Sequence, residues 1–302
     1  MQLRAIDSPA KAGLLSPSLQ APSRSLPSVF KRNWRLYLYE ASELALFMLS
    51  ACGFTIILFE PSWFGTRFVP SEIIRRALMA MAMGITAVLI IRSPMGKRSG
   101  AHFNPAITLT YLRLGKVVLW DAMFYVLFQF LGGIFGVALA AAVFGRSLSN
   151  PSINYAVTVP GRYGTIAAFV AELFMAALLM TVVLLLSNRS HLAVYVSYSV
   201  GILIAMYAFF LGPVSGFSIN PARTTGSAVF ASVWTAVWLY FVAPLLGMLF
   251  AAEIYPKING DARVLCAKLH PAQEFPCPFI CEHPEHCCTR RLDADNGYPL
   301  GS

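Results

Sequence analysis

The sequence predicts an all-α membrane protein with six transmembrane helices and two shorter, re-entrant half-helices. Of its 302 residues, 57% are hydrophobic and only 12% are charged, whereas charged residues make up about a quarter of an ordinary soluble domain. Six apolar runs approach or exceed the roughly 20 helical residues that a hydrocarbon core requires. Two further apolar runs are too short to span it. Most of the chain is therefore expected inside a bilayer.

The first segment, residues 1–35, precedes these runs and is rich in Ser, Pro and basic side chains. Its Leu residues are interrupted by polar ones, so it lacks the continuous apolar stretch of a signal peptide. We expect residues 1–35 to be a basic, disordered tail.

The six expected spans come next. The third carries small residues at 132, 133 and 136, which let neighbouring helix backbones approach closely. The spans are expected at 36–59, 73–92, 118–144, 165–187, 192–211 and 233–255.

The two short apolar runs, 101–112 and 217–230, each contain the tripeptide Asn-Pro-Ala. Pro at the first helical position gives up only an N–H that has no helical partner, and Asn before it can cap the helix. Non-helical backbone at membrane depth occurs only where protein buries it or where it lines a wet cavity. Two such half-helices therefore indicate a pore or a binding site. The motif residues are Asn104, Pro105, Ala106, Asn220, Pro221 and Ala222.

The expected channel domain, 36–255, divides into two similar halves, 36–144 and 165–255. Each half contains two spans, a half-helix and a third span. Because three spans per half is an odd number, the halves are expected to have opposite orientations, as in an inverted repeat. The two half-helices then enter the membrane from opposite faces.

The half-helices predict how such a pore discriminates between solutes. Their N-termini meet near the bilayer middle, where the positive dipole ends oppose cations. The amides of Asn104 and Asn220 can donate hydrogen bonds to one passing oxygen and so orient a water molecule. Arg223 adds a permanent charge inside an apolar region, and such a residue marks function. The pattern favours passage of small uncharged molecules and exclusion of ions.

Two Asn-Pro-Ala motifs at matching places in two three-span repeats, with Arg223 after the second, resemble the major intrinsic protein family, the aquaporins and aquaglyceroporins. The resemblance covers about 36–255. It implies an aquaporin-like fold, a passive channel and a homotetramer with one pore per subunit. It also places Arg223 in the aromatic/arginine selectivity filter near the outer mouth.

By the same resemblance, counted without gaps from the two motifs, the other filter positions are Gly84, Ala208 and Phe217. Two of the four walls are then almost absent. We expect a wide pore for water together with glycerol, urea or undissociated metalloid acids.

Other positions give conflicting indications of subtype, some resembling water channels and some departing from the pattern of glycerol facilitators. Glycerol facilitators typically carry an acid and a basic residue where this chain has Thr224 and Ala228, and the pair Tyr240 and Phe241 resembles water channels. A strictly water-selective aquaporin therefore stays open as the alternative.

Several polar residues are assigned to the scaffold by resemblance. Glu40 and Glu172 are expected to accept hydrogen bonds from the loops before the half-helices, with Glu43 as the alternative to Glu40. Gln129 is expected as a polar anchor in the third span. His102 is expected to bond a loop carbonyl, with pH gating as the less favoured interpretation.

The last segment, residues 256–302, lies outside the resemblance and is rich in Cys and His. Soft sulfur and nitrogen ligands so close together could hold one zinc ion, although the spacing is not a standard one. A solvated tail is the alternative. The speculative ligands are Cys277, Cys281, His283, His286, Cys287 and Cys288.

The charge distribution predicts topology. Seventeen of the 23 Lys and Arg residues fall on the side of both termini, so we expect both tails in the cytoplasm and a multi-pass protein of the plasma (inner) membrane. The +9 net charge then needs no nucleic-acid partner. A secondary transporter, or a non-conducting sensor acting through the tail, are the alternatives from other classes. No nucleophile–base pair or cofactor loop indicates an enzyme, and no cofactor is expected.

Overall fold

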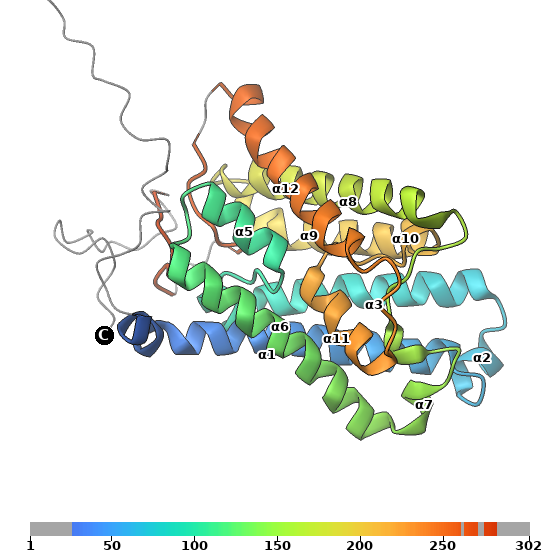
Figure 1. Ribbon diagram of the computed structural model, residues 1–302. Helices are drawn as coiled ribbons and strands as arrows, with labels where there is room; N and C mark the ends of the chain where they lie inside the picture. The colour runs from blue at the N-terminus through green and yellow to red at the C-terminus, as the bar shows by residue number, and fades with distance from the viewer. Residues whose placement is uncertain (1–25, 261–262, 271–274, 283–302) are drawn as a thin grey trace, which may run out of the picture.

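The computed structural model describes residues 26–260, 263–270 and 275–282. Every regular element in these ranges is a helix (Figure 1). Six helical segments of the described chain are long and apolar enough to cross a bilayer, which confirms the predicted fold class. They are α1 (Leu26–Phe59), α3 (Glu72–Arg92), α6 (Leu119–Phe144), α8 (Gly164–Ser187), the segment Ala193–Ser215, and α12 (Leu239–Ile258).

The first helix corrects one expected boundary. Residues 26–35, assigned to the disordered tail, form the first turns of α1. Phe30 packs against Phe124 of α6, with ring centroids 5.2 Å apart. Asp121 at the start of α6 accepts hydrogen bonds from Asn33 Nδ2 at 2.9 Å and from the Tyr37 hydroxyl at 2.5 Å. These contacts with α6 order a segment whose composition alone suggested a tail.

The fifth span and the half-helices have internal structure of their own. The fifth span joins η3 (Ala193–Tyr195), α9 (Val196–Met206), a π-helical turn η4 (Tyr207–Leu211) and α10 (Gly212–Ser215). The half-helices are α5 (Pro105–Arg113) and α11 (Pro221–Ala231). The remaining short helices are α2 (Phe64–Phe68), α4 (Pro94–Ser99), α7 (Arg146–Ser149) and η2 (Asn154–Ala156).

Small residues bring the spanning helices together, in the same way in both halves. A Cβ on Gly132 of α6 would lie 2.2 Å from the Ala41 carbonyl oxygen of α1. A Cβ on Gly247 of α12 would lie 2.3 Å from the Leu173 carbonyl oxygen of α8. Only glycine permits such approaches. The pairs α1 with α6 and α8 with α12 are thus equivalent, as an inverted repeat requires.

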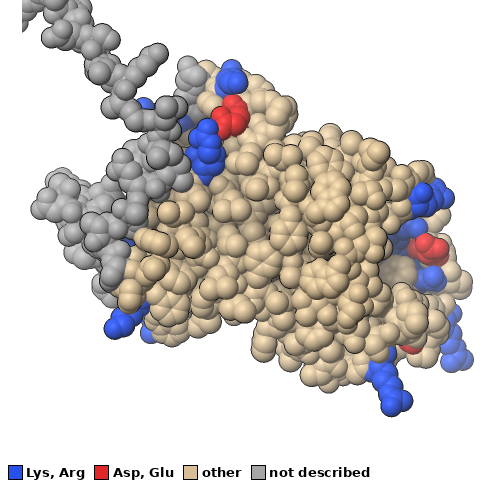
Figure 2. Space-filling view, viewed as in Figure 1, with Lys and Arg blue, Asp and Glu red and all other residues tan. Residues whose placement is uncertain are grey.

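The surface suits a bilayer. Charged side chains gather at the two ends of the helical bundle, and an uncharged belt lies between them (Figure 2). Apolar side chains in this belt are exposed, for example Ile166 at 82% and Phe135 at 63%.

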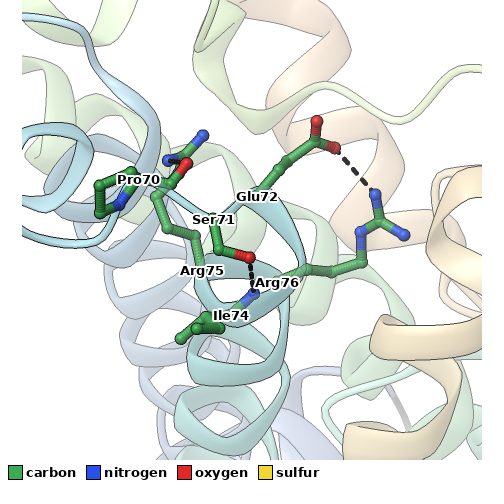
Figure 3. Close-up of polar contacts among 6 residues, drawn as sticks. All are labelled: Pro70, Ser71, Glu72, Ile74, Arg75 and Arg76. Carbon is green, nitrogen blue, oxygen red and sulfur yellow. Dashed lines mark hydrogen bonds and ion pairs between the residues drawn. The ribbon is translucent and has the colours of Figure 1, made fainter.

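The start of α3, at the end far from the termini, shows how the charged rim is built (Figure 3). Ser71 caps the helix by accepting from the Ile74 N–H at 3.5 Å, and Arg76 pairs with Glu72 at 2.8 Å. Arg75 donates to two carbonyl groups of the preceding loop. Polar contacts therefore begin where the apolar span ends.

Candidate functional site

The two half-helices begin at the Asn-Pro-Ala motifs. Asn104 Oδ1 accepts from the Ala106 N–H at 2.9 Å, and Asn220 Oδ1 accepts from the N–H groups of Ala222 at 3.1 Å and Arg223 at 3.2 Å. These are the caps that the sequence predicts. With Oδ1 occupied by the cap, each amide group presents only its Nδ2 donors to other partners.

The residues that begin the two half-helices also form hydrogen bonds with each other's loops. Asn104 Nδ2 donates to the Ile219 carbonyl, and Asn220 Nδ2 donates to the Phe103 carbonyl, both at 2.8 Å. The N-termini of α5 and α11 therefore meet inside the molecule. Their positive dipole ends are brought to one place.

In the first half, Glu40 supports the loop before Asn104. Its carboxylate is buried and accepts from the N–H groups of His102 at 3.0 Å and Phe103 at 2.6 Å. Gln129 Nε2 donates to the same carboxylate at 2.7 Å. Glu40 thus contacts the loop backbone where the sequence assigns it.

In the second half, Glu172 has the equivalent position. It accepts from the N–H groups of Ser218 at 2.9 Å and Ile219 at 2.5 Å, which are the second and first residues before Asn220. The Ser215 hydroxyl also donates to it, at 2.7 Å. One buried carboxylate in each half therefore satisfies two adjacent backbone donors.

Sequence reasoning missed further equivalent contacts. The hydroxyl of Tyr125 donates to the Ser99 carbonyl at 2.7 Å, and that of Tyr240 donates to the Ser215 carbonyl at 2.6 Å. The Ser99 hydroxyl donates to Glu43 at 2.7 Å, so both acids of α1 contact the first loop. The repeated Ser-Gly pair, five residues before each motif Asn, is the signal that could have found the two serines.

The loops carry strained backbone at matching places. Ala101 and Phe103 have φ of +58° and +30°, and Phe217 and Ile219 both have φ of +48°. Non-glycine residues adopt this region at a cost of about 1–3 kcal/mol each. The hydrogen bonds to the two buried carboxylates offset that cost and hold the loops in this form.

His102 contacts a part of the chain that the sequence does not connect with it. Its Nε2 donates to the Ala267 carbonyl at 2.8 Å, and its Nδ1 lies 3.1 Å from Thr108 Oγ1. Its ring stacks between Tyr111 and Phe279, with centroids 5.2 and 5.0 Å away. The expected loop carbonyl is thus supplied by a residue beyond α12.

A narrow cavity of about 40 Å³ lies where the half-helices meet. That volume is enough for water, which needs about 10–15 Å³. Apart from the polar groups of the two motifs, the lining is mostly apolar. It comprises Phe47, His102, Phe103, Asn104, Ile107, Leu179, Val183, Val200, Ile204, Phe217, Ser218, Ile219, Asn220 and Leu269.

Of the four expected filter residues, Phe217 is in the lining of this cavity. Its ring contacts the Tyr207 ring edge-on, with centroids 6.0 Å apart. Ala208 is one helical turn beyond the cavity-lining Ile204. Arg223 Nη1 is buried and has no hydrogen-bond partner among the residues that the structure describes.

Gly84, the filter position expected from the gap-free count, lies against α9. A Cβ on Gly84 would lie 2.5 Å from the Gly201 carbonyl oxygen, so this position faces α9. Thr86 hydrogen-bonds to α1 at 2.8 Å, and Ile85 is 59% exposed. At 100° per residue, the arc of α3 between α9 and α1 is occupied by Met83, which is buried. Met83 is therefore a buried side chain on the arc between the faces of α3 that contact α9 and α1.

Two of the speculative metal ligands come together, with one that the sequence did not select. The Sγ atoms of Cys266, Cys277 and Cys281 lie within 4.8 Å of one another. The other speculative ligands, His283, His286, Cys287 and Cys288, lie outside the described residues.

Comparisons with known proteins agree with this geometry. A family model described as major intrinsic protein matches residues 29–255. The chain is 32% identical over 191 residues to Aquaporin Z of Rhodopseudomonas palustris, a match that covers 61% of this chain and 79% of that protein. It is 31% identical over 179 residues to a probable NIP-type aquaporin of Nicotiana alata, and over 186 residues to aquaporin NIP1-2 of Arabidopsis thaliana. These two matches span 64% and 62% of the relatives' lengths.

A solved structure is also similar. The X-ray structure of the aquaglyceroporin from Plasmodium falciparum superposes with a TM-score of 0.65 at 21% identity, covering 75% of this chain and 96% of that one. At this identity the likeness shows a common fold.

Proposed function

The chain belongs to the major intrinsic protein family, and from that premise we propose that its pore passes water together with small uncharged solutes such as glycerol, urea or undissociated metalloid acids. Members of this family are aquaporin and aquaglyceroporin channels rather than enzymes. The proposal goes beyond the family in naming the solutes. The observation that carries it is the small side chain of Ala208, one turn from the cavity-lining Ile204.

The charge arrangement supports exclusion of ions. The buried Nη1 of Arg223 repels cations and offers a hydrogen bond to a neutral oxygen. The N-termini of α5 and α11, held together through Asn104 and Asn220, add a second barrier. A hydroxylated solute can accept from these donors, whereas a cation meets positive potential at both places.

Pore width is set by fewer small residues than the sequence indicated. The backbone of α9 fills the space beside Gly84, so that glycine does not widen the pore. Met83, the buried neighbour of Gly84, is the residue that we expect to contribute a flexible thioether at this depth. Ala208 is then the small wall, and pore diameter follows the side chains that line it.

Stopped-flow measurements on proteoliposomes test the proposal. Wild-type protein should raise water, glycerol and urea flux above that of protein-free vesicles. Ala208→His should lower glycerol and urea flux more than water flux, whereas the size-matched Ala208→Ser should keep all three. Glycerol flux at the protein-free rate beside fast water flux would support a strictly water-selective aquaporin. Flux that responds to an ion gradient would support a secondary transporter instead.

We further propose that both tails are cytoplasmic, that the membrane is the plasma membrane and that the protein is a homotetramer. The excess of basic residues on the side of the termini supports the orientation. The apolar side chains exposed around the bundle provide surface for subunits as well as lipid. Protease accessibility of the tails in sealed vesicles, and the mass of the purified complex, test the orientation and the assembly.

A further inference from the structure

A segment beyond the last span packs against the half-helix α5 and the loop before it. We call residues 263–270 and 275–282 the C-terminal cap. The Leu269 N–H donates to the Gly100 carbonyl, and the Ile280 N–H donates to the Lys116 carbonyl, both at 3.0 Å. Lys116 and Glu282 form an ion pair at 2.9 Å. The cap is therefore bound to the loop before α5 and to the turn after it.

The cap reaches the pore lining itself. Leu269 is one of the residues around the cavity that contains Asn104 and Asn220. The Ala267 carbonyl accepts from His102, and the Phe279 ring stacks on His102 with an interplanar angle of 4°. Two parts of the cap, 266–269 and 277–280, thus meet on one side chain of the pore loop.

Two cysteines join these two parts. The Sγ atoms of Cys266 and Cys277 are 3.5 Å apart, and both side chains are buried. The Lys268 N–H also donates to the Cys266 sulfur at 3.5 Å. The thiolate form of a cysteine is the nucleophile in thiol oxidation.

The pair fits redox chemistry better than metal binding. A closed zinc site needs four ligands. Cys281, the third sulfur of the group, is disulfide-bonded, so among the residues that the structure describes the group has two thiols, at Cys266 and Cys277. Two thiols whose sulfur atoms are 3.5 Å apart have the composition and the spacing of a dithiol that can be oxidised to a disulfide.

We propose that Cys266 and Cys277 form a redox latch, in which oxidation by a hydroperoxide links them and fixes the cap over the pore. The Cys266 thiolate attacks one peroxide oxygen and breaks the O–O bond, giving a sulfenic acid and, after protonation, an alcohol or water. The Cys277 sulfur then attacks the sulfenic sulfur, its proton leaves with the hydroxyl as water, and a disulfide remains. Two electrons pass from the dithiol to the peroxide.

The latch would restrict flux because the two cysteines belong to the two parts of the cap that touch His102. Linking them holds Ala267, Leu269 and Phe279 in one arrangement against the pore loop. In the structure the two cysteines are not linked, and hydrogen bonds, an ion pair and ring contacts hold the cap in place. Without the link the docking is reversible, so a reducing cytoplasm would let the cap move away from the pore loop. This effect on flux depends on the proposed channel function.

The test uses the full chain in proteoliposomes with a metal chelator present. Vesicles are treated with hydrogen peroxide or with dithiothreitol, water flux is measured, and cross-linked peptides are identified by mass spectrometry. We expect peroxide to give a Cys266–Cys277 cross-link and a several-fold lower flux that dithiothreitol restores. Cys266→Ser and Cys277→Ser should keep full flux in peroxide, whereas the control variants Cys52→Ser and Cys281→Ser should behave as wild type.

Each outcome bears on the latch separately from the channel. Absence of the cross-link, a cross-link to Cys281 in its place, or a complete cross-link with unchanged flux would each overturn the latch. Reduced protein that conducts no water would contradict the proposed function, and the cross-link itself would still be decided by mass spectrometry. Leu269→Ala keeps both cysteines, and it should reduce the loss of flux in peroxide without affecting the cross-link.

Discussion

Asn104 and Asn220 each donate one amide N–H to the loop that precedes the other asparagine, and each has a second amide N–H that makes no such bond. An amide nitrogen has two hydrogens, and in each residue Nδ2 donates to the carbonyl before the partner Asn at 2.8 Å. The oxygen is occupied by the helix cap. The two remaining N–H groups are the donors available to a molecule in the cavity. The motif thus joins the halves of the fold and offers hydrogen bonds to the permeant with the same side chains.

Asn220→Asp should admit protons. Aspartate keeps the oxygen that caps α11, but it loses both Nδ2 donors and introduces a negative charge beside the Phe103 carbonyl. Loss of the buried hydrogen bond costs about 1–3 kcal/mol. We expect lower water flux and faster dissipation of a pH gradient, read with a pH-sensitive dye inside vesicles. Asn259→Asp, at the end of α12, is the control. A variant that stays proton-tight would contradict the assigned role of the amide.

Glu172→Gln should destabilise the fold. One carboxylate oxygen becomes an NH₂ group facing backbone donors, and an unsatisfied buried donor costs about 1–3 kcal/mol. Glu40→Gln should have a similar effect, because the two carboxylates make equivalent contacts. The measurement is the thermal unfolding midpoint in detergent. Glu253→Gln removes only an exposed ion pair with Arg113 and should change the midpoint little.

Tyr125→Phe and Tyr240→Phe should each lower the free energy of unfolding by about 0.5–1.5 kcal/mol, the usual value of one hydrogen bond. Each hydroxyl is the donor to a buried serine carbonyl in its own half. Chemical denaturation in mixed micelles measures the change. If one variant is neutral and the other strongly destabilised, the two loops are not energetically equivalent.

Gly84→Ala should weaken helix packing and leave selectivity unchanged. The added Cβ would meet the Gly201 carbonyl at 2.5 Å, and such overpacking costs about 1–3 kcal/mol. Met83→Phe should instead lower the ratio of glycerol to water flux, since Met83 is the residue that we expect to contribute to the pore wall at this depth. If Gly84→Ala changes the ratio of glycerol to water flux and leaves the midpoint of unfolding unchanged, Gly84 is a filter residue.

Cys266 should react with iodoacetamide in a pH-dependent way. The hydrogen bond from Cys277 is the largest cause that lowers its pKa to about 7, and the other groups around it are Lys268, Cys281 and Tyr111. Because the thiolate is the nucleophile, the alkylation rate should rise as the pH passes through about 7. Cys277→Ser replaces the thiol donor and should shift that midpoint. Peptide mapping against time gives the rate at Cys266 alone.

The half-helix starts could be predicted because they depend on local chemistry. Proline at 105 and 221 and asparagine before it determine where each helix begins, whatever surrounds it. The repeated order of long and short apolar runs then predicts the inverted halves. The contact of Tyr125 with Ser99 was beyond such reasoning, since it depends on how α6 crosses the loop.

Gly84 shows a second limit of the sequence. Counting from a motif gives the depth of a residue but not the direction of its side chain, and a shift of one position turns a helix by 100°. The contacts of α3 with α9 and α1 determine that direction. The cap was unpredictable for a similar reason, because residues 263–282 have no helical or alternating pattern that would indicate docking.

Leu269 follows all six spans in the chain, yet it belongs to the wall of the cavity. During synthesis the helices can insert and the two motifs can meet while this residue is still inside the ribosome. The cavity is then enclosed on this side only when the final segment docks. The last wall to be added is therefore also the one that can be removed without disturbing the membrane-spanning helices.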